Sequence, residues 1–424
     1  MKRNARETLM QSGRDSIFSV GILCKWLVLG SAVGLIVGAV ASVFGHALIA
    51  VNDFRAAQPW IVYLLPVGGL VIAFLYHRFG SDDRGTNTII ASIHSGVKVL
   101  FRMAPMIFVS TVITHLCGGS AGREGAALQL GGSIAGKMGS ILHLDERDKK
   151  LMIMCGMSAG FSALFGTPLA AAVFSMEVVS IGIMHYSALV PCVTAALVAH
   201  FVAEGMHIPP EVFPVAEVPE MTPAFLFAIA AFAAAAGAVS ILFCLVLHGG
   251  EHLYHKYLKN RYVRVLVGGC LVAALASIPG MGIYLGSGMG IIEEILHHGG
   301  KVVPWAFLFK MVFTMLTLGA GFKGGEIVPS FSIGAAFGCT AAALMGLPVE
   351  LVAACGMVGV FCGVTNSPIA SLLVAFELFG FEAMPYYLVT IAVSYMLSGR
   401  FGLYREQRLM YSKTEPRFIN TTTH

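Results

Sequence analysis

The 424-residue sequence is very apolar: 57% of its residues are hydrophobic, 12% are charged, and its mean hydropathy is +0.80. Soluble domains carry about 25% charged residues, so this composition excludes a soluble globular protein. Uncharged stretches such as residues 222–247 are long enough to cross a bilayer core of about 30 Å. A barrel would need alternating segments of about ten residues, so we expect a polytopic helical membrane protein.

The chain divides into two apolar halves. We expect an N-terminal segment at residues 1–18, a first transmembrane repeat at 19–203, a linker at 204–221, a second repeat at 222–412 and a tail at 413–424. Lysine and arginine gather at both ends, which predicts that both termini are cytoplasmic in an inner or plasma membrane. We find no cleavable signal peptide, and we interpret the nine scattered cysteines as small buried hydrophobic residues.

The first repeat opens with two apolar segments at residues 20–51 and 60–79. Residues 85–88, Gly-Thr-Asn-Thr, follow a polar stretch. Taken alone, they are typical of an aqueous loop with an Asn/Gly turn.

A glycine-rich stretch at residues 117–138 carries Arg123 and Glu124 deep within the apolar chain. It predicts an irregular loop that opens a helix, with Glu124 near the first turn. The unpaired N–H groups and positive dipole end of a helix attract anions, and glycine lets the backbone approach a ligand. An ionisable residue at membrane depth is a functional candidate. The alternative is a tight turn between packed helices that Glu124 caps.

The second repeat carries a copy of this stretch at residues 319–338, and the alignment sets Glu326 on Glu124. Residues 155–177 recur 200 positions later with seven identities and no gap. The chain is therefore an internal duplication, a pattern typical of transporters whose site lies where two broken helices meet.

Glu177 and Glu377 occupy equivalent positions in the two repeats, each after a proline, Pro168 or Pro368. Such symmetric carboxylates are more typical of a structural role than of a catalytic one. We expect them to cap broken helices or to pack at the repeat boundary.

Three motifs give a specific resemblance. Gly-Arg-Glu-Gly at 122–125 resembles the G-x-E-G signature of the ClC family of chloride channels and proton-coupled antiporters. Gly-Gly-Glu-Ile-Val-Pro at 324–329 resembles the family's second-half signature, and Gly-Leu-Tyr at 402–404 resembles its tyrosine segment. The resemblance runs from about Leu27 to Tyr404. It implies an all-α polytopic fold, an inverted repeat of broken and re-entrant helices, and a homodimer.

The resemblance also implies the site. Glu124 would gate the pathway and couple it to protons, and Glu326 is a second candidate carboxylate. The ligands would be a halide anion, chloride or fluoride, and protons, in a protein that contacts lipid and uses no nucleic acid, cofactor or metal. The implied anion-binding residues are Thr86, Gly122, Arg123, Gly125, Gly325, Ile327, Val328 and Tyr404.

The chain departs from the family pattern in two places, and its match to the fluoride/proton antiporter branch is incomplete. The usual internal proton-relay glutamate falls on Val178, so that relay is absent. Glu326 stands where chloride members have an apolar residue, which is similar to the fluoride/proton antiporter branch. That branch has methionine where this chain has Thr86. For Glu326 we expect either a functional carboxylate, with Lys323 as a possible partner, or a structural helix cap.

We therefore predict a halide/proton antiporter rather than an enzyme. One alternative is a passive chloride channel without proton coupling. A more remote one is a membrane-embedded hydrolase that uses both glutamates, although no nucleophile–base or metal set accompanies them. A structural or receptor protein is the third, and the charged, glycine-rich re-entrant loops disfavour it.

Overall fold

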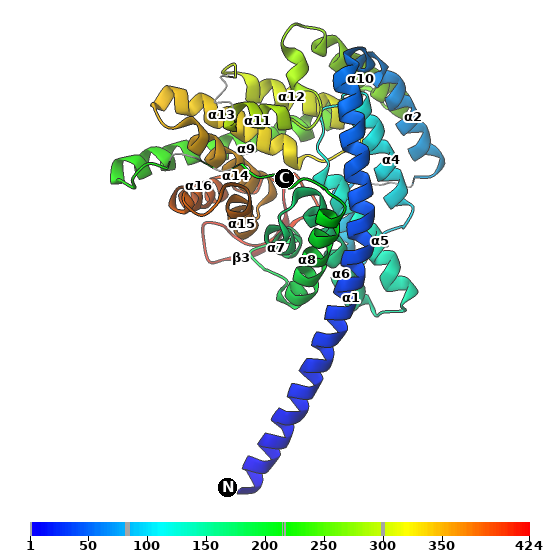
Figure 1. Ribbon diagram of the computed structural model, residues 1–424, viewed down its shortest axis with the longest axis vertical. Helices are drawn as coiled ribbons and strands as arrows, with labels where there is room; N and C mark the ends of the chain where they lie inside the picture. The colour runs from blue at the N-terminus through cyan, green and yellow to red at the C-terminus, as the bar shows by residue number, and fades with distance from the viewer. Residues whose placement is uncertain (1, 81–84, 214, 216–217, 298–301) are drawn as a thin grey trace.

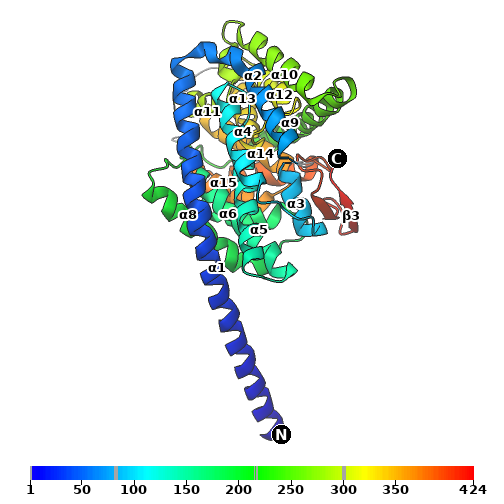
Figure 2. The same ribbon diagram turned by 90° about the vertical axis from the view of Figure 1, so that its right-hand side faces the viewer.

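The protein is described here by a computed structural model that covers residues 2–80, 85–213, 215, 218–297 and 302–424, with side chains from residue 19 onward. Helices make up most of the chain, and the long helix α1 (Lys2–Ala57) runs along one side of the helical body (Figures 1 and 2). The apolar segment expected at residues 20–51 lies within α1. The backbone of residues 2–18, where we expect a separate N-terminal segment, belongs to the same helix, and the side chains of residues 1–18 lie outside the described residues.

Local sequence signals set the helix boundaries of the first repeat. The Asp145 side chain accepts a hydrogen bond of 2.7 Å from the Asp148 N–H and so caps α6, and Gly166, in the left-handed conformation, ends it. Pro168 then begins α7. After α1 the elements are η1 (Pro59–Leu64), α2 (Leu65–Arg78), α3 (Thr86–Ser95), α4 (Met103–Leu116), α5 (Glu124–Ile141), α6 (Glu146–Phe165), α7 (Pro168–Glu177), β1 (Ser180–Ile181), η2 (Tyr186–Ala188) and α8 (Leu189–Gly205).

The second repeat follows the same plan. Thr222 caps α9 by accepting a hydrogen bond of 3.2 Å from the Phe225 N–H. The elements are α9 (Pro223–Tyr257), α10 (Arg261–Ala276), η3 (Met281–Tyr284), α11 (Met289–Leu296), α12 (Ala306–Leu318), α13 (Ile327–Met345), α14 (Val349–Thr365), α15 (Pro368–Phe379), α16 (Met384–Leu397), β2 (Arg408–Tyr411) and β3 (Phe418–Thr422).

Some helices span a membrane and others stop inside the protein. Within the described ranges, five are long and apolar enough to cross: Ser19–Ala57, Pro59–Arg78, Tyr186–Gly205, Pro223–Tyr257 and Ile327–Met345. In contrast, α7 has 10 residues. A helix of that length reaches about 15 Å, half of a bilayer core. The expected broken helices are therefore present, and they are tolerated because protein surrounds their ends.

Glycines bring the central helices of each repeat into backbone contact. A Cβ atom added at Gly131 of α5 would lie 1.9 Å from the carbonyl oxygen of Gly156 in α6. In the second repeat, a Cβ atom at Gly334 of α13 would lie 2.3 Å from the carbonyl oxygen of Gly356 in α14. Only glycine fits at such crossings. The two helix pairs use equivalent glycines, which confirms the duplication predicted from the sequence.

Helices α7 and α15 cap each other across the boundary between the repeats. The Glu177 carboxylate, at the end of α7, accepts hydrogen bonds of 3.1 and 2.8 Å from the N–H groups of Ile369 and Ala370 at the start of α15. The Glu377 carboxylate accepts equivalent bonds of 3.0 and 2.8 Å from Leu169 and Ala170 at the start of α7. The structural interpretation of these two glutamates is confirmed.

The chain also contains a small sheet that the all-α prediction omitted. Strand β2 pairs in parallel with β1 and antiparallel with β3, in the order β1-β2-β3. Residues 413–424, expected to be a simple polar tail, complete this hairpin. The Thr423 hydroxyl donates a hydrogen bond of 2.7 Å to the carbonyl oxygen of Tyr404. The end of the sequence therefore packs against the tyrosine segment.

Candidate functional site

The two signature loops meet through their backbones. The Gly122 N–H donates to the Gly325 carbonyl oxygen at 2.6 Å, and the Gly325 N–H donates to the Gly122 carbonyl oxygen at 2.7 Å. A Cβ atom at Gly125 would lie 2.9 Å from the Gly325 Cα atom, so a side chain does not fit there. This antiparallel bridge brings together the N-termini of α5 and α13, which are the positive ends of their helix dipoles.

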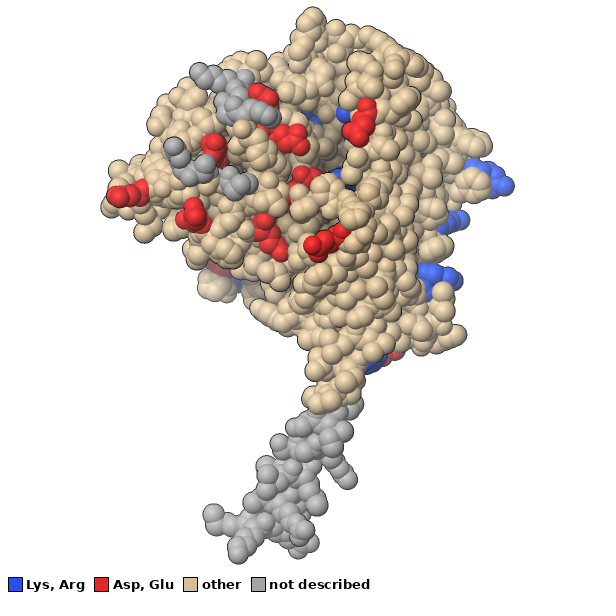
Figure 3. Space-filling view, in the orientation of Figure 1, with Lys and Arg blue, Asp and Glu red and all other residues tan. Residues whose placement is uncertain are grey.

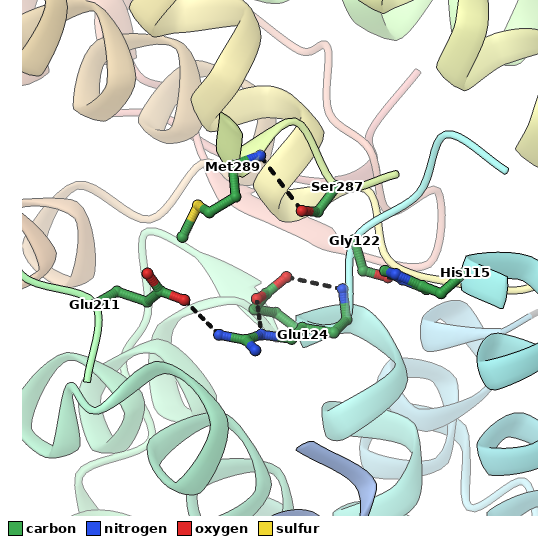
Figure 4. Close-up of polar contacts among 7 residues, drawn as sticks. His115, Gly122, Glu124, Glu211, Ser287 and Met289 are labelled. Carbon is green, nitrogen blue, oxygen red and sulfur yellow. Dashed lines mark hydrogen bonds and ion pairs between the residues drawn. The ribbon is translucent and has the colours of Figure 1, made fainter. Parts of the chain in front are cut away.

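Glu124, the first residue of α5, is fully buried. Its Oε2 atom accepts a hydrogen bond of 3.1 Å from the Arg123 N–H, and its Oε1 atom lies 3.4 Å from Arg123 Nε (Figure 4). The carboxylate therefore folds back over the helix N-terminus, where an anion would otherwise be favoured.

Arg123 contacts a second carboxylate that the sequence analysis missed. Its Nη2 atom donates to Glu211 Oε1 at 2.5 Å (Figure 4). Glu211 belongs to the linker, which we had interpreted only as a connection between the repeats. No spacing rule pairs a linker residue with the Glu124 loop, so this contact has no signal in the sequence.

The structure corrects the sequence alignment of the two glutamates. Arg123 is the N-cap of α5 and Glu326 is the N-cap of α13, so Glu326 is equivalent to Arg123 and Ile327 is equivalent to Glu124. The alignment was wrong by one residue because the bridge between the loops, rather than the matching glutamates, sets the register.

Glu326 is half-buried and lines a cavity whose lining does not include Glu211. Its side chain makes no capping hydrogen bond to α13, so the helix-cap interpretation is not supported. The ammonium of Lys323, its expected partner, lies instead 4.3 Å from the centre of the Tyr76 ring. Within the described part of the chain, no ion pair involves Glu326.

The N-terminus of α3 also lies at the bridge between the two signature loops. Thr86 is the first residue of α3, is buried, and follows Gly85, whose φ is +64°. Its hydroxyl oxygen accepts a hydrogen bond of 3.2 Å from Gln129 Nε2. A Cβ atom at Gly125 would lie 3.5 Å from Thr86 Oγ1 and 3.3 Å from Glu326 Oε2. Residues 85–88 therefore open a helix at the site and do not form an aqueous loop.

Tyr404 completes the cluster. It is fully buried, and its hydroxyl has no hydrogen-bond partner within the described part of the chain. It lies within electrostatic range of both Glu124 and Glu326. The first residues of α13, Ile327 and Val328, are also buried. A buried hydroxyl without a partner is costly, so this group is suited to donating to a ligand.

A cavity of about 1080 Å³ leads to the cluster from one side. Thr86 and Glu326 line its inner end. The wall is rich in cations, which raise the local concentration of an anion inside a cleft of low dielectric. The Lys and Arg residues that line it are Lys259, Arg261, Arg264, Lys323 and Arg405. Sequence analysis did not identify this group, because its members come from separate elements.

Comparisons with known proteins agree with this geometry. Residues 68–399 match the sequence profile of the family described as voltage gated chloride channel. The chain belongs to this family. A chloride/fluoride channel protein of Pseudomonas syringae pv. tomato is 38% identical over 400 residues, which cover 92% of this chain and 88% of the relative. An H⁺/Cl⁻ exchange transporter of Vibrio cholerae is 24% identical over 386 residues, covering 83% of this chain and 81% of the relative.

Solved structures of ClC proteins share the fold. A CLC-type fluoride/proton antiporter superposes with a TM-score of 0.87 and 32% identity, covering 91% of this chain and 98% of the other. A slow cyanobacterial Cl⁻/H⁺ antiporter superposes with a TM-score of 0.76 and 19% identity, covering 88% and 94%. This ClC chain is therefore a membrane protein, as its composition predicted.

Proposed function

We propose that this protein exchanges a halide, preferably fluoride, for protons across a cell membrane. One observation carries the proposal. Helix N-termini of both repeats meet at the bridge between the signature loops, where Glu124 is fully buried and Glu326 lines the cavity. The likeness to a fluoride/proton antiporter and to a chloride/fluoride channel protein supports the choice of ligand.

The anion is bound chiefly by N–H groups of the backbone. The loop residues of the two signatures supply these groups, and the hydroxyls of Thr86 and Tyr404 add side-chain donors. Fluoride is small and strongly hydrated, so several donors must replace its water. The proposed backbone contributors are Gly122, Arg123, Gly125, Gly325, Ile327 and Val328.

Proton coupling follows because the Glu124 carboxylate and the halide compete for the same position at the N-terminus of α5. Charged Glu124 accepts the Arg123 N–H and occupies the N-terminus of α5. When Glu124 is protonated, its attraction to the helix end weakens and a halide takes its place. Glu326 lies on the cavity side and delivers the proton, because buried Val178 cannot serve as a relay.

We further propose that the cavity opens to the cytoplasm and that the linker lies outside, in a homodimeric protein. The face seen in Figure 3 gathers acidic side chains and exposes few Lys and Arg residues, which is typical of an extracellular face. Both termini would then be cytoplasmic, and each subunit would hold its own pathway.

Replacing Glu124 with glutamine tests the mechanism. Glutamine cannot titrate and mimics the neutral side chain, so we expect proton uptake by proteoliposomes to fall at least about tenfold while fluoride flux persists. Flux is measured with a fluoride electrode and uptake with a pH electrode, with sodium fluoride or sodium chloride as the salt. Continued proton pumping by Glu124→Gln would contradict the assignment.

The same assay separates the alternatives. A passive channel would carry halide without proton uptake in the unmodified protein. Chloride flux equal to fluoride flux would contradict the fluoride preference. A hydrolase or a structural protein would move neither ion.

A further inference from the structure

Two cations meet on the outer side of the Glu124 loop. Lys310 of α12 is fully buried, and its ammonium donates hydrogen bonds of 2.7 and 3.0 Å to the carbonyl oxygens of Gly286 and Tyr284. Arg55, in the last turn of α1, lies against the same glycine: a Cβ atom at Gly286 would be 3.2 Å from Arg55 Nη2. Segments far apart in the sequence thus place two positive groups at one glycine.

Neither cation has an acidic partner among the described residues. Within the residues that the structure describes, no carboxylate oxygen lies within 4.0 Å of the Arg55 guanidinium or the Lys310 ammonium. The charge that acts on Lys310 is that of Arg55, which repels it. Burying cations without a counter-charge costs free energy, and a bound anion would recover part of that cost.

Donor capacity near the pair remains unused. The Nε atom of Arg55 is buried and has no hydrogen-bond partner in the described structure. Buried polar groups are normally satisfied, so an unpaired guanidinium N–H beside two cations indicates an acceptor ligand that the protein alone does not supply.

The pair also lies next to the gating loop. The third hydrogen bond of the Lys310 ammonium, of 2.8 Å, goes to the hydroxyl of Ser120, four residues before Glu124. A Cβ atom at Gly118 would lie 3.4 Å from Arg55 Cδ. In Figure 3, acidic side chains surround a hollow in which Lys and Arg side chains are visible. An acidic rim repels anions, so an attractive site inside it would be needed for a halide to enter.

We propose that Arg55 and Lys310 form an extracellular binding site for a small monovalent anion, where the halide is held before it reaches Glu124. This inference rests on the proposed function and deepens it, because it assigns a second ligand position on the outer side of the gate. The site is separate from the backbone donors at the N-termini of α5 and α13. Arg55 donates to the anion, and Lys310, whose three N–H groups already donate to protein oxygens, contributes its buried charge.

The test is halide transport measured separately from each side of oriented proteoliposomes. We expect Arg55→Gln and Lys310→Met to raise the KM for fluoride added outside by about tenfold, with kcat and the KM for fluoride added inside unchanged, since binding but not the exchange step is lost. Arg55→Lys should restore most of the affinity. Lys98→Met, which removes an exposed cation elsewhere, is the matched control.

A second measurement does not depend on transport or on the variants. Crystals of the unmodified protein in sodium bromide should show an anomalous bromide peak between Arg55 and Lys310. Absence of the peak at saturating bromide, or an external KM within twofold of normal in both charge-removing variants, would overturn the inference. A bromide peak in a protein that moves no halide would support the site and contradict the proposed function.

Discussion

At the residue scale, the site contains few charged side chains, and these differ in whether they form ion pairs. Arg123 contacts both Glu124 and Glu211, so the carboxylate of the proposed gate shares its cation with the linker. Glu326, in contrast, has no ion pair within the described residues and lines the cavity. The two carboxylates therefore differ in environment as well as in position, and we expect them to perform different steps.

Glu326→Gln tests the second step. Because glutamine cannot release a proton, we expect fluoride uptake to continue while proton movement slows by about tenfold, which changes the measured fluoride-to-proton ratio. Glu251→Gln is the control, since Glu251 lines the same cavity but lies 3.4 Å from Arg405. An unchanged ratio in a normally folded Glu326→Gln protein would leave Glu326 without a role in coupling.

At the element scale, the broken helices are stabilised by each other. Helices α7 and α15 both begin within the protein, and each needs acceptors for its first N–H groups. The acceptors come from the opposite repeat, through Glu177 and Glu377. Each repeat therefore supplies the carboxylate that caps a broken helix of the other repeat, and these hydrogen bonds join the two repeats.

Removing either cap should destabilise the protein. Hydrogen bonds to a charged group contribute about 1.5–3 kcal/mol, so we expect Glu177→Ala to lower the free energy of unfolding by about 2–3 kcal/mol. Glu377 is more exposed, and we expect about 1–2 kcal/mol for Glu377→Ala because water can replace part of its role. Unfolding of the purified protein in denaturant measures both changes.

The control for the caps is Glu382→Ala. Glu382 is exposed, just beyond α15, and its loss should change the unfolding free energy by no more than about 0.5 kcal/mol. The double variant should show roughly the sum of the two single effects, since the caps lie at different helix ends. If neither cap variant differs from the control, the reciprocal capping contributes nothing measurable.

At the scale of the whole molecule, the duplication makes the site two-sided. The Arg123–Glu211 pair lies toward the linker, whereas Glu326 lines the cavity with Arg261 and Arg405. Proteins that exchange two ligands need a site reached from both sides, and inverted repeats are one way to build it. In the proposed orientation, the linker surface faces the outside and the cavity faces the cytoplasm.

Cysteine accessibility in sealed vesicles checks this orientation. In a chain with the exposed Cys24 and Cys270 replaced by serine, we expect Glu220→Cys in the linker to react with an impermeant thiol reagent added outside. Thr422→Cys in the C-terminal hairpin should react only after the vesicles are opened. Labelling of both positions from the same side would contradict the proposed topology.

The sequence by itself determined the class of protein and its duplication, and it predicted the core of the candidate site. Hydrophobic length and the scarcity of charge are local properties, so they predict membrane helices without any knowledge of contacts. Glycine-rich loops with a charge are also local, and they identified Glu124, Glu326 and, through the family resemblance, Thr86 and Tyr404.

Only the tertiary structure decided how these parts face one another. The pairing of Arg123 with Glu211, the cation pair at Gly286 and the docking of Thr423 on Tyr404 join residues that are distant in the chain. The bridge between the signature loops shifted the alignment of the repeats by one residue, which moved Glu326 to the N-cap position. Such contacts depend on packing geometry, and side-chain periodicity and spacing carry no information about it.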